Sequence, residues 1–135
     1  MAEMTKWEAQ QYYWSSFGLL AFNEQTVPDF VPVEEGQQIV MKPLETPYIT
    51  YEPVVGSLNG PMTATARVWY HGTSYKDVFK KCDEIAEKGD KEIPIKGGKM
   101  LVRIPERNFA RPLDDPNDKQ LRTAVLTVNI EFLSM

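Results

Sequence analysis

Few side chains in this sequence have the chemistry that catalysis requires. The chain contains one histidine, His71, and one cysteine, Cys82. Nucleophilic catalysis needs a base beside the nucleophile, and structural zinc needs several cysteine or histidine ligands. Cys82 falls on the apolar side of a predicted helix, so we expect a buried, unreactive thiol and not a partner for His71. We therefore predict no catalytic residue and no cofactor, and that the protein is not an enzyme.

Two further patterns resemble ligand sites only in part. The acidic run from Asp114 to Asp118 offers the oxygen ligands that calcium prefers, but it lacks the spacing and the closing glutamate of an EF-hand. Pro116 and Asn117 lie within it, and a turn is the better interpretation. The run Gly97-Gly98-Lys99 lacks the other glycine and the following helix of a phosphate-binding loop, so it predicts a hairpin turn. We expect no metal site.

One basic and aromatic cluster remains, formed by Arg103, Arg107, Phe109 and Arg111. Such a cluster suits single-stranded nucleic acid, or it pairs with carboxylates of a neighbouring subunit. The net charge of −4 and the pI of about 5.0 argue against a general binder of phosphate backbones. We therefore favour a subunit contact. The candidate contact residues are Arg107, Phe109, Arg111, Asp114 and Asp115.

Length and composition indicate one globular domain spanning residues 1–135, with 42% hydrophobic and 25% charged residues. A single cysteine allows no intrachain disulfide. The sequence has no apolar stretch near the roughly 18 residues of a membrane span. Its first residues are polar and include acids, unlike a secretory signal. We expect a protein that is made and assembled in a cytoplasm and makes no membrane contact.

Two segments read as helices. Residues 5–17 begin with Thr5 and Glu8 at capping-box spacing, and Trp7, Trp14 and Phe17 recur at near-helical intervals. Residues 74–89 carry one apolar stripe at helical spacing. The stripe consists of Tyr75, Val78, Phe79, Cys82, Ile85 and Ala86.

Alternation of apolar and polar residues predicts the strands. Residues 48–55 and 62–70 form one expected hairpin, and residues 92–96 and 99–104 form another. The last strand lies within residues 118–135 and has an apolar face with period two. That face consists of Ala124, Leu126, Val128, Ile130 and Phe132. The predicted fold is α+β: an antiparallel β-sheet with two α-helices packed on one face, plus an extended Pro-rich arm.

Two long connections interrupt this pattern. Residues 23–46 contain Pro28, Pro32 and Pro43, and they fit either a small hairpin or an extended arm. Residues 105–117 read as a polar loop. Long connections are uncommon in compact domains and are often functional. We therefore predict that residues 29–45 and 105–117 are contact loops.

A series of short motifs runs along most of the chain. The motifs are Trp14-Ser15-Ser16-Phe17-Gly18, Ala21-Phe22-Asn23-Glu24, Val27-Pro28, Pro47-Tyr48-Ile49-Thr50-Tyr51, Trp69-Tyr70, Thr73-Ser74, Asp83-Glu84-Ile85, Gly97-Gly98 and Asp114-Asp115-Pro116-Asn117-Asp118. Taken in this order and spacing, they resemble small tail proteins of long-tailed phages and prophages of Gram-positive bacteria. Such proteins are called tail completion, tail terminator or minor tail proteins.

The resemblance implies a virion structural protein with an α+β subunit that forms a hexameric ring. The ring would cap the tail tube at the end near the head and stop tube growth. Its partners would be other copies of the chain, the phage tail tube protein and the head-to-tail connector protein, while DNA would pass through the lumen without specific binding. The family offers no catalytic residues to carry over. Residues 29–45 form a longer arm than the resemblance leads us to expect.

Taken without the resemblance, the residues indicate a soluble α+β domain with interaction surfaces. The alternative function is therefore a small cytoplasmic adaptor or binding domain that acts as a monomer or dimer. The mass of the protein in solution and images of rings distinguish these two hypotheses.

Overall fold

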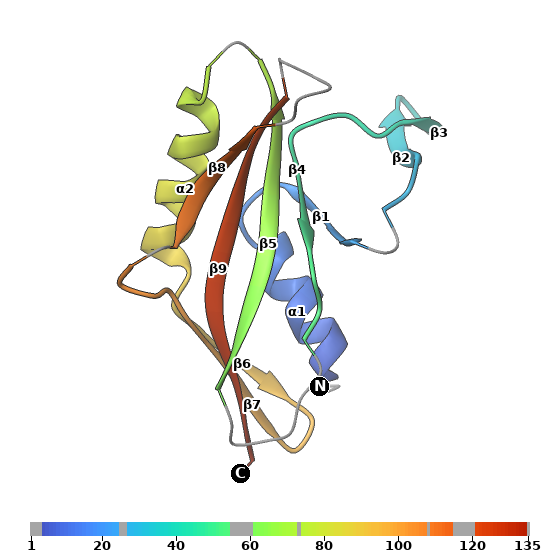
Figure 1. The fold of residues 1–135 in the computed structure, drawn as a ribbon. Helices are drawn as coiled ribbons and strands as arrows, with labels where there is room; N and C mark the ends of the chain where they lie inside the picture. The colour runs from blue at the N-terminus through green and yellow to red at the C-terminus, as the bar shows by residue number, and fades with distance from the viewer. Residues whose placement is uncertain are drawn as a thin grey trace.

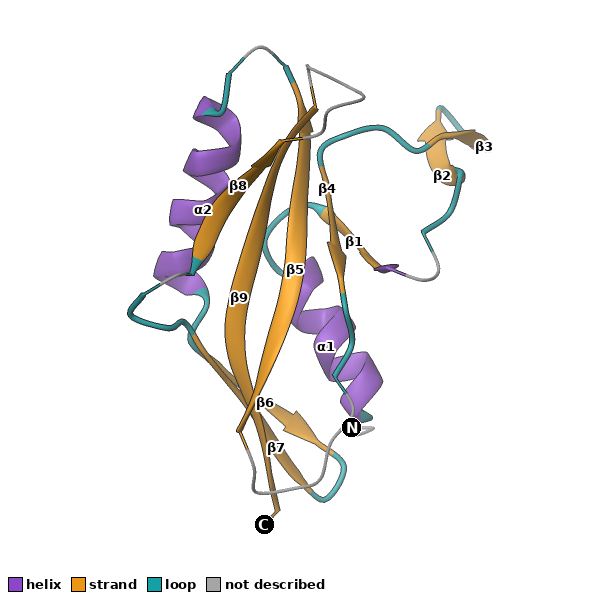
Figure 2. Cartoon of the chain, viewed as in Figure 1, coloured by secondary structure: helices purple, strands orange, loops and turns teal. Residues whose placement is uncertain are grey.

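The computed structural model describes residues 4–24, 27–54, 61–72, 74–107, 109–114 and 121–134. Its fold is α+β, with two helices packed on one face of a strongly curled sheet and a separate two-stranded hairpin (Figures 1 and 2). The elements are α1 (Lys6–Ser15), β1 (Leu20–Asn23), β2 (Phe30–Glu35), β3 (Gln38–Pro43), β4 (Tyr48–Tyr51), β5 (Pro61–His71), α2 (Lys76–Lys88), β6 (Lys91–Ile95), β7 (Gly98–Arg103), β8 (Ala110–Asp114) and β9 (Leu121–Ser134).

The sheet is organised around β9. Its strand order is β1-β4-β5-β9-β7-β6, with β8 also paired to β9. Because β5 follows β9 along one edge, β7 and β8 share the other edge, β7 beside residues 129–134 and β8 beside residues 122–126. The hairpin pairs predicted from the sequence, β4–β5 and β6–β7, are both antiparallel. The sheet is nevertheless mixed, because β1 runs parallel to β4.

The apolar face of β9 lies in the core, as its alternation predicts. Its five apolar residues are all fully buried, and the register sets them beside Ala64, Ala66 and Val68 of β5. The opposite, outer face of β9 is more enclosed than the sequence suggests. Thr123 and Val125 are also buried there, because β5 and β8 flank both edges of the strand.

Helix α1 begins with the predicted capping box. The Glu8 amide donates to Thr5 Oγ1 at 3.2 Å, and the Thr5 amide donates to Glu8 Oε1 at 3.0 Å. Trp14 and Phe17 are buried, but Trp7 is 53% exposed. Only part of the predicted aromatic series therefore belongs to the core.

Helix α2 buries a narrower stripe than the sequence pattern indicates. Val78, Cys82 and Ile85 are buried against the sheet, because they follow the spacing i, i+4, i+7 of one helix face. Phe79 and Ala86 border that face and are exposed.

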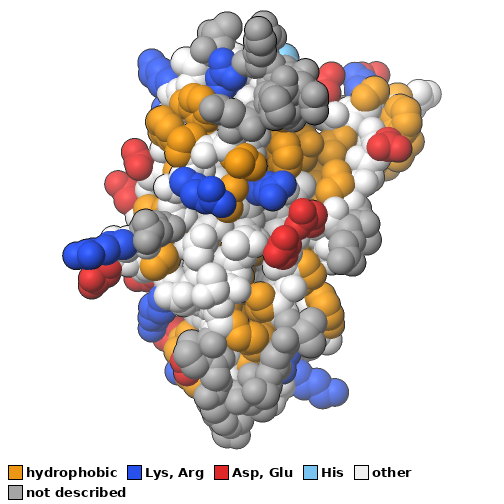
Figure 3. Space-filling view, viewed as in Figure 1, with side chains coloured by type: hydrophobic (Ala, Val, Ile, Leu, Met, Phe, Trp, Pro, Cys, Tyr) orange, Lys and Arg blue, Asp and Glu red, His pale blue; other side chains and the backbone are white. Residues whose placement is uncertain are grey.

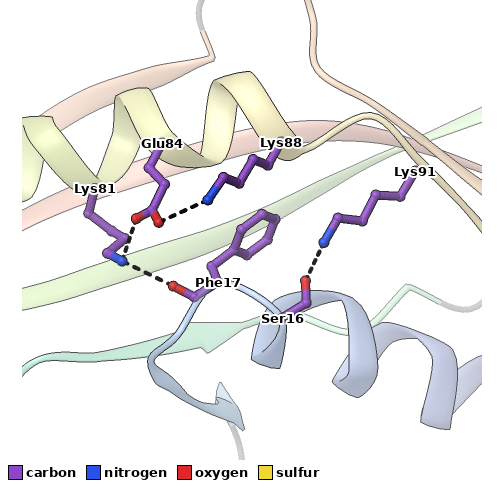
Figure 4. A network of polar contacts seen from close by, with 6 residues as sticks. All are labelled: Ser16, Phe17, Lys81, Glu84, Lys88 and Lys91. Carbon is purple, nitrogen blue, oxygen red and sulfur yellow. Dashed lines mark hydrogen bonds and ion pairs between the residues drawn. The ribbon is translucent and has the colours of Figure 1, made fainter.

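Polar contacts tie α2 and β6 to the end of α1 (Figure 4). Lys81 Nζ donates to the Phe17 carbonyl at 3.0 Å and lies 2.5 Å from Glu84 Oε2. Lys91 Nζ donates to Ser16 Oγ at 2.6 Å. The hydrogen bond and charge of Lys81 lower the pKa of Glu84. These bonds satisfy carbonyl and hydroxyl groups beyond the last turn of α1, where a helix leaves backbone groups without partners.

The structure corrects one assignment made from the sequence and contains one strand that the sequence did not predict. Residues 105–117 were expected to form a loop, but Ala110–Asp114 form strand β8 on the edge of β9. Pro112 is compatible with this strand because β8 pairs with β9 alone among the described strands. Leu20–Asn23 form β1, a short strand with no sequence signal of its own. Within the described residues, neither helix has the length and apolar character needed to cross a membrane.

Candidate interaction surfaces

Three of the predicted contact residues, Arg107, Phe109 and Arg111, lie within β8 or in the segment just before it, at one edge of β9. Arg107 is exposed in the connection from β7, and Arg111 is exposed within β8. Phe109 is half-buried against the core, and its carbonyl accepts a hydrogen bond from the Thr127 amide at 2.7 Å. We call Arg107, Phe109, Arg111 and the half-buried Leu113 the β8 surface.

The two predicted acidic contact residues are described less fully. The backbone of Asp114 pairs with that of Arg122, while its side chain is not among the described groups. Asp115 lies outside the described residues, as does most of the acidic run that was weighed as a calcium site. Their part in a contact stays a prediction.

The β8 surface continues into a hollow of about 320 Å³ on the outer face of the sheet. Arg111 and Leu113 line one side of it, and residues from β4, β5 and β9 complete it. The full lining is Glu24, Thr50, Glu52, Thr65, Ala66, Arg67, Arg111, Leu113 and Val125. Figure 3 shows basic and acidic side chains gathered on this face of the molecule. Charges of both signs around a shallow hollow suit polar contacts with a protein surface.

Three aromatic rings cross the outer face beside this hollow. Phe22 of β1, Tyr48 of β4 and Trp69 of β5 lie in a row, with neighbouring ring centroids 6.2 Å apart. Trp69 Nε1 donates to Thr50 Oγ1 at 2.8 Å, which satisfies the indole of a half-buried residue. The row gives this end of the outer face an aromatic surface.

The β2–β3 hairpin exposes an apolar face of its own and stands clear of the sheet (Figure 1). The cross-strand register puts Phe30, Pro32, Ile39 and Met41 on one side of it. Phe30, Ile39 and Met41 are 54%, 71% and 59% exposed. A two-stranded hairpin is marginally stable in water unless something covers it, and exposed apolar patches often mark interaction sites. Residues 30–33 and 39–41 are two short apolar runs in the sequence, but these runs did not show which side of the hairpin is exposed.

The other side of the hairpin is better satisfied. Val33 and Val40 form a cross-strand pair there and are both half-buried. An ion pair joins Lys42 to Glu35 on the same side. The Leu44 amide donates to the Asp29 carbonyl at 2.9 Å and closes the base of the hairpin. The hairpin is therefore a well-paired element in which one face makes internal contacts and the other face is uncovered.

A second apolar depression, of about 590 Å³, lies along the exposed side of α1. Met4, Trp7 and Tyr12 supply its apolar lining, and Glu8 supplies a carboxylate. Trp7 and Tyr12 are both more than half exposed. This depression is a competing place for a partner.

Nothing in the described arrangement builds a reactive centre around Cys82 or His71. Cys82 is 5% exposed, and burial, with a smaller effect of the neighbouring Asp83, raises the pKa of its thiol to about 11. His71 is exposed at the end of β5. The described residues contain no group of three or more histidine, cysteine, aspartate or glutamate side chains placed to hold a metal ion. The expected absence of enzymatic activity stays a prediction.

Comparison of the chain with protein-family models, with curated proteins and with solved structures finds no match. The tail-protein resemblance therefore depends on the motifs alone. Several of the motif residues have packing roles in the structure. Trp14 of the first motif stacks on Tyr51, with ring centroids 6.3 Å apart, and Ile49 is fully buried. These positions account for stability, and they do not by themselves define a function.

Proposed function

We propose that this chain is a structural protein of a phage virion that forms a ring at the head-proximal end of the tail tube. The ring ends tube growth and joins the tail to the head. The observation that carries this proposal is the ordered motif series over most of the chain, from Trp14 to Asp118. The uncovered apolar face of the β2–β3 hairpin supports assembly with other chains, because a monomer would leave that face in water.

The proposed mechanism is geometric. A tail tube grows by adding rings edge to edge, and a ring ends growth when one face copies the tube contacts and the other does not. Subunits that join through two different surfaces form a closed ring when the rotations between successive neighbours add up to a full turn. The net charge of −4 suits a conduit, since an acidic wall repels the DNA that passes it.

Negative-stain images of the purified protein, alone and mixed with tail tubes, test the proposal. We expect one ring at one end of each tube, and we expect capped tubes to stop elongating. The mass of the ring should correspond to six subunits. Copies distributed along the tube would instead identify a tube protein. A monomer or dimer that leaves tubes uncapped would favour the adaptor alternative.

A further inference from the structure

We propose that the β2–β3 hairpin of one copy of this chain docks on the β8 surface of a second copy. This inference specifies the subunit contact of the proposed ring. It rests on the proposed function only in requiring that copies of the chain associate. It assigns the two halves of the subunit contact to two different surfaces.

The hairpin has the apolar content of a docking element. Phe30, Ile39 and Met41 lie on one side and are each more than half exposed, so burying them would remove much apolar surface from water. Leu113 and Phe109 of the β8 surface are half-buried, and Leu113 also lines the hollow beside Arg111. An apolar centre with charged residues around it is the usual arrangement of a protein interface.

The charges of the two surfaces are complementary. Residues 29–45 carry four carboxylates and one lysine, and that lysine already pairs with Glu35 within the hairpin. Residues 103–113 carry three arginines and one glutamate. Glu34 lies opposite Ile39 in the register, on the same side of the hairpin as Phe30 and Met41. A carboxylate placed there would meet Arg111 or Arg107 when the apolar side chains are buried.

The two surfaces lie on opposite sides of the subunit (Figure 1). The hairpin leaves the sheet between β1 and β4, while β8 lies on the far edge of β9, with β5 and β9 in between. A contact between two different surfaces on opposite sides adds copies head to tail. Such a contact gives a closed ring when the rotation between neighbouring copies closes.

Two other docking places fit the hairpin less well. The depression on α1 is apolar, but it carries Glu8, which would oppose Glu34. Pairing the apolar faces of two hairpins would bring the Glu34 carboxylates of both copies into one interface. Like charges brought together at an interface cost affinity, so both arrangements are disfavoured relative to the arginines of the β8 surface.

Cross-linking of cysteine variants tests the assignment. Ile39→Cys and Leu113→Cys place one thiol on each surface, and Cys82 is buried in all of them. With a short bismaleimide at about 0.5 mM protein, where even a millimolar contact is partly populated, the double variant should give a ladder of covalent oligomers. A mixture of the two single variants should give dimers only, and each single variant alone should stay uncross-linked.

The control pairs Ile39→Cys with Tyr12→Cys, a position in the α1 depression that is more exposed than Leu113. Cross-linking of this pair in place of the Leu113 pair would overturn the proposal, as would dimers of Ile39→Cys alone. A double variant without a ladder would overturn it too. These results are obtained without tail tubes, so they are distinct from a failure of tube capping.

Charge reversal gives a second readout. Glu34→Lys should weaken self-association at least tenfold, which corresponds to about 1.4 kcal/mol. Adding Arg111→Glu should restore most of the loss, because it re-creates an opposite pair. Gln38→Lys is the matched control, since Gln38 lies in register with Glu35 on the other side of the hairpin. Equal weakening by Glu34→Lys and Gln38→Lys, or no rescue, would contradict the proposed contact.

Discussion

Gln10 and Val54 are joined by two hydrogen bonds, in which the side-chain amide of Gln10 pairs with the backbone of Val54 as a neighbouring strand would. Gln10 Nε2 donates to the Val54 carbonyl at 3.0 Å, and the Val54 amide donates to Gln10 Oε1 at 2.8 Å. Gln10 is 1% exposed, on the side of α1 that packs toward the sheet. Its amide satisfies backbone groups just after β4, where the chain has left the ladder.

We therefore predict that Gln10→Leu destabilises the protein by about 2–4 kcal/mol, because it leaves the amide and carbonyl of Val54 without partners while keeping the side-chain volume. Urea unfolding measures the change. Gln37→Leu, at an exposed turn position, should change stability by about 0.5 kcal/mol or less. Similar changes in both variants would show that the paired bonds contribute little.

Cys82 should behave as a structural residue. Its burial against the sheet predicts slow labelling by a thiol reagent at pH 8, with a large increase on unfolding. Cys82→Ala should cost about 1–2 kcal/mol through lost buried volume, without loss of association. Fast labelling of the native protein would show that α2 does not cover this thiol.

The raised pKa of Cys82 also predicts a dependence of stability on pH. The ordinary thiol pKa is 9.0 and the folded value is about 11, so between these values the unfolded chain has lost a proton that the folded chain keeps. The stability contributed by the thiol is complete below pH 9 and falls as the pH rises toward 11. The free energies of unfolding of the wild type and of Cys82→Val should converge or cross between pH 9 and pH 11. Parallel curves over this range would refute the raised pKa of the thiol. The tyrosines ionise in both proteins, so the comparison removes their contribution to the pH dependence of stability.

Reversing two charges on the β8 surface should separate folding from assembly. Arg107 and Arg111 are exposed, so Arg107→Glu with Arg111→Glu should leave the melting temperature within a few degrees of wild type. The same change should abolish self-association, because it would set two new carboxylates of the β8 surface against the acidic hairpin. Sedimentation and thermal unfolding measure the two effects. Unchanged association in the double variant would rule out this surface as the contact.

We expect no stable complex with DNA at physiological salt. The net charge of −4 leaves little release of counterions to drive binding, although Arg103, Arg107 and Arg111 could still touch phosphates that pass through a lumen. Gel shifts with micromolar protein and duplexes of several sequences measure this. A tight, sequence-dependent shift would instead identify residues 103–111 as a recognition site.

Periodicity alone predicted much of the fold. The alternation in β9 and the spacing of Val78, Cys82 and Ile85 each report which side of one element meets the core, and that information is contained in neighbouring residues. The capping box at Thr5 and Glu8 is equally local. The α+β class, the two helices on one face and the β4–β5 and β6–β7 hairpins follow from such signals.

The tertiary structure decided the features that depend on distant partners. Leu20–Asn23 become a strand because Tyr48–Tyr51 lie beside them, and Ala110–Asp114 become one because β9 offers an edge. The sequence identified Arg107, Phe109 and Arg111 as a cluster. It did not show Arg67 across the hollow, or a hairpin with an uncovered face on the opposite side. Backbone pairing and side-chain exposure are set by what packs from elsewhere in the chain, and a local pattern of residues does not contain that information.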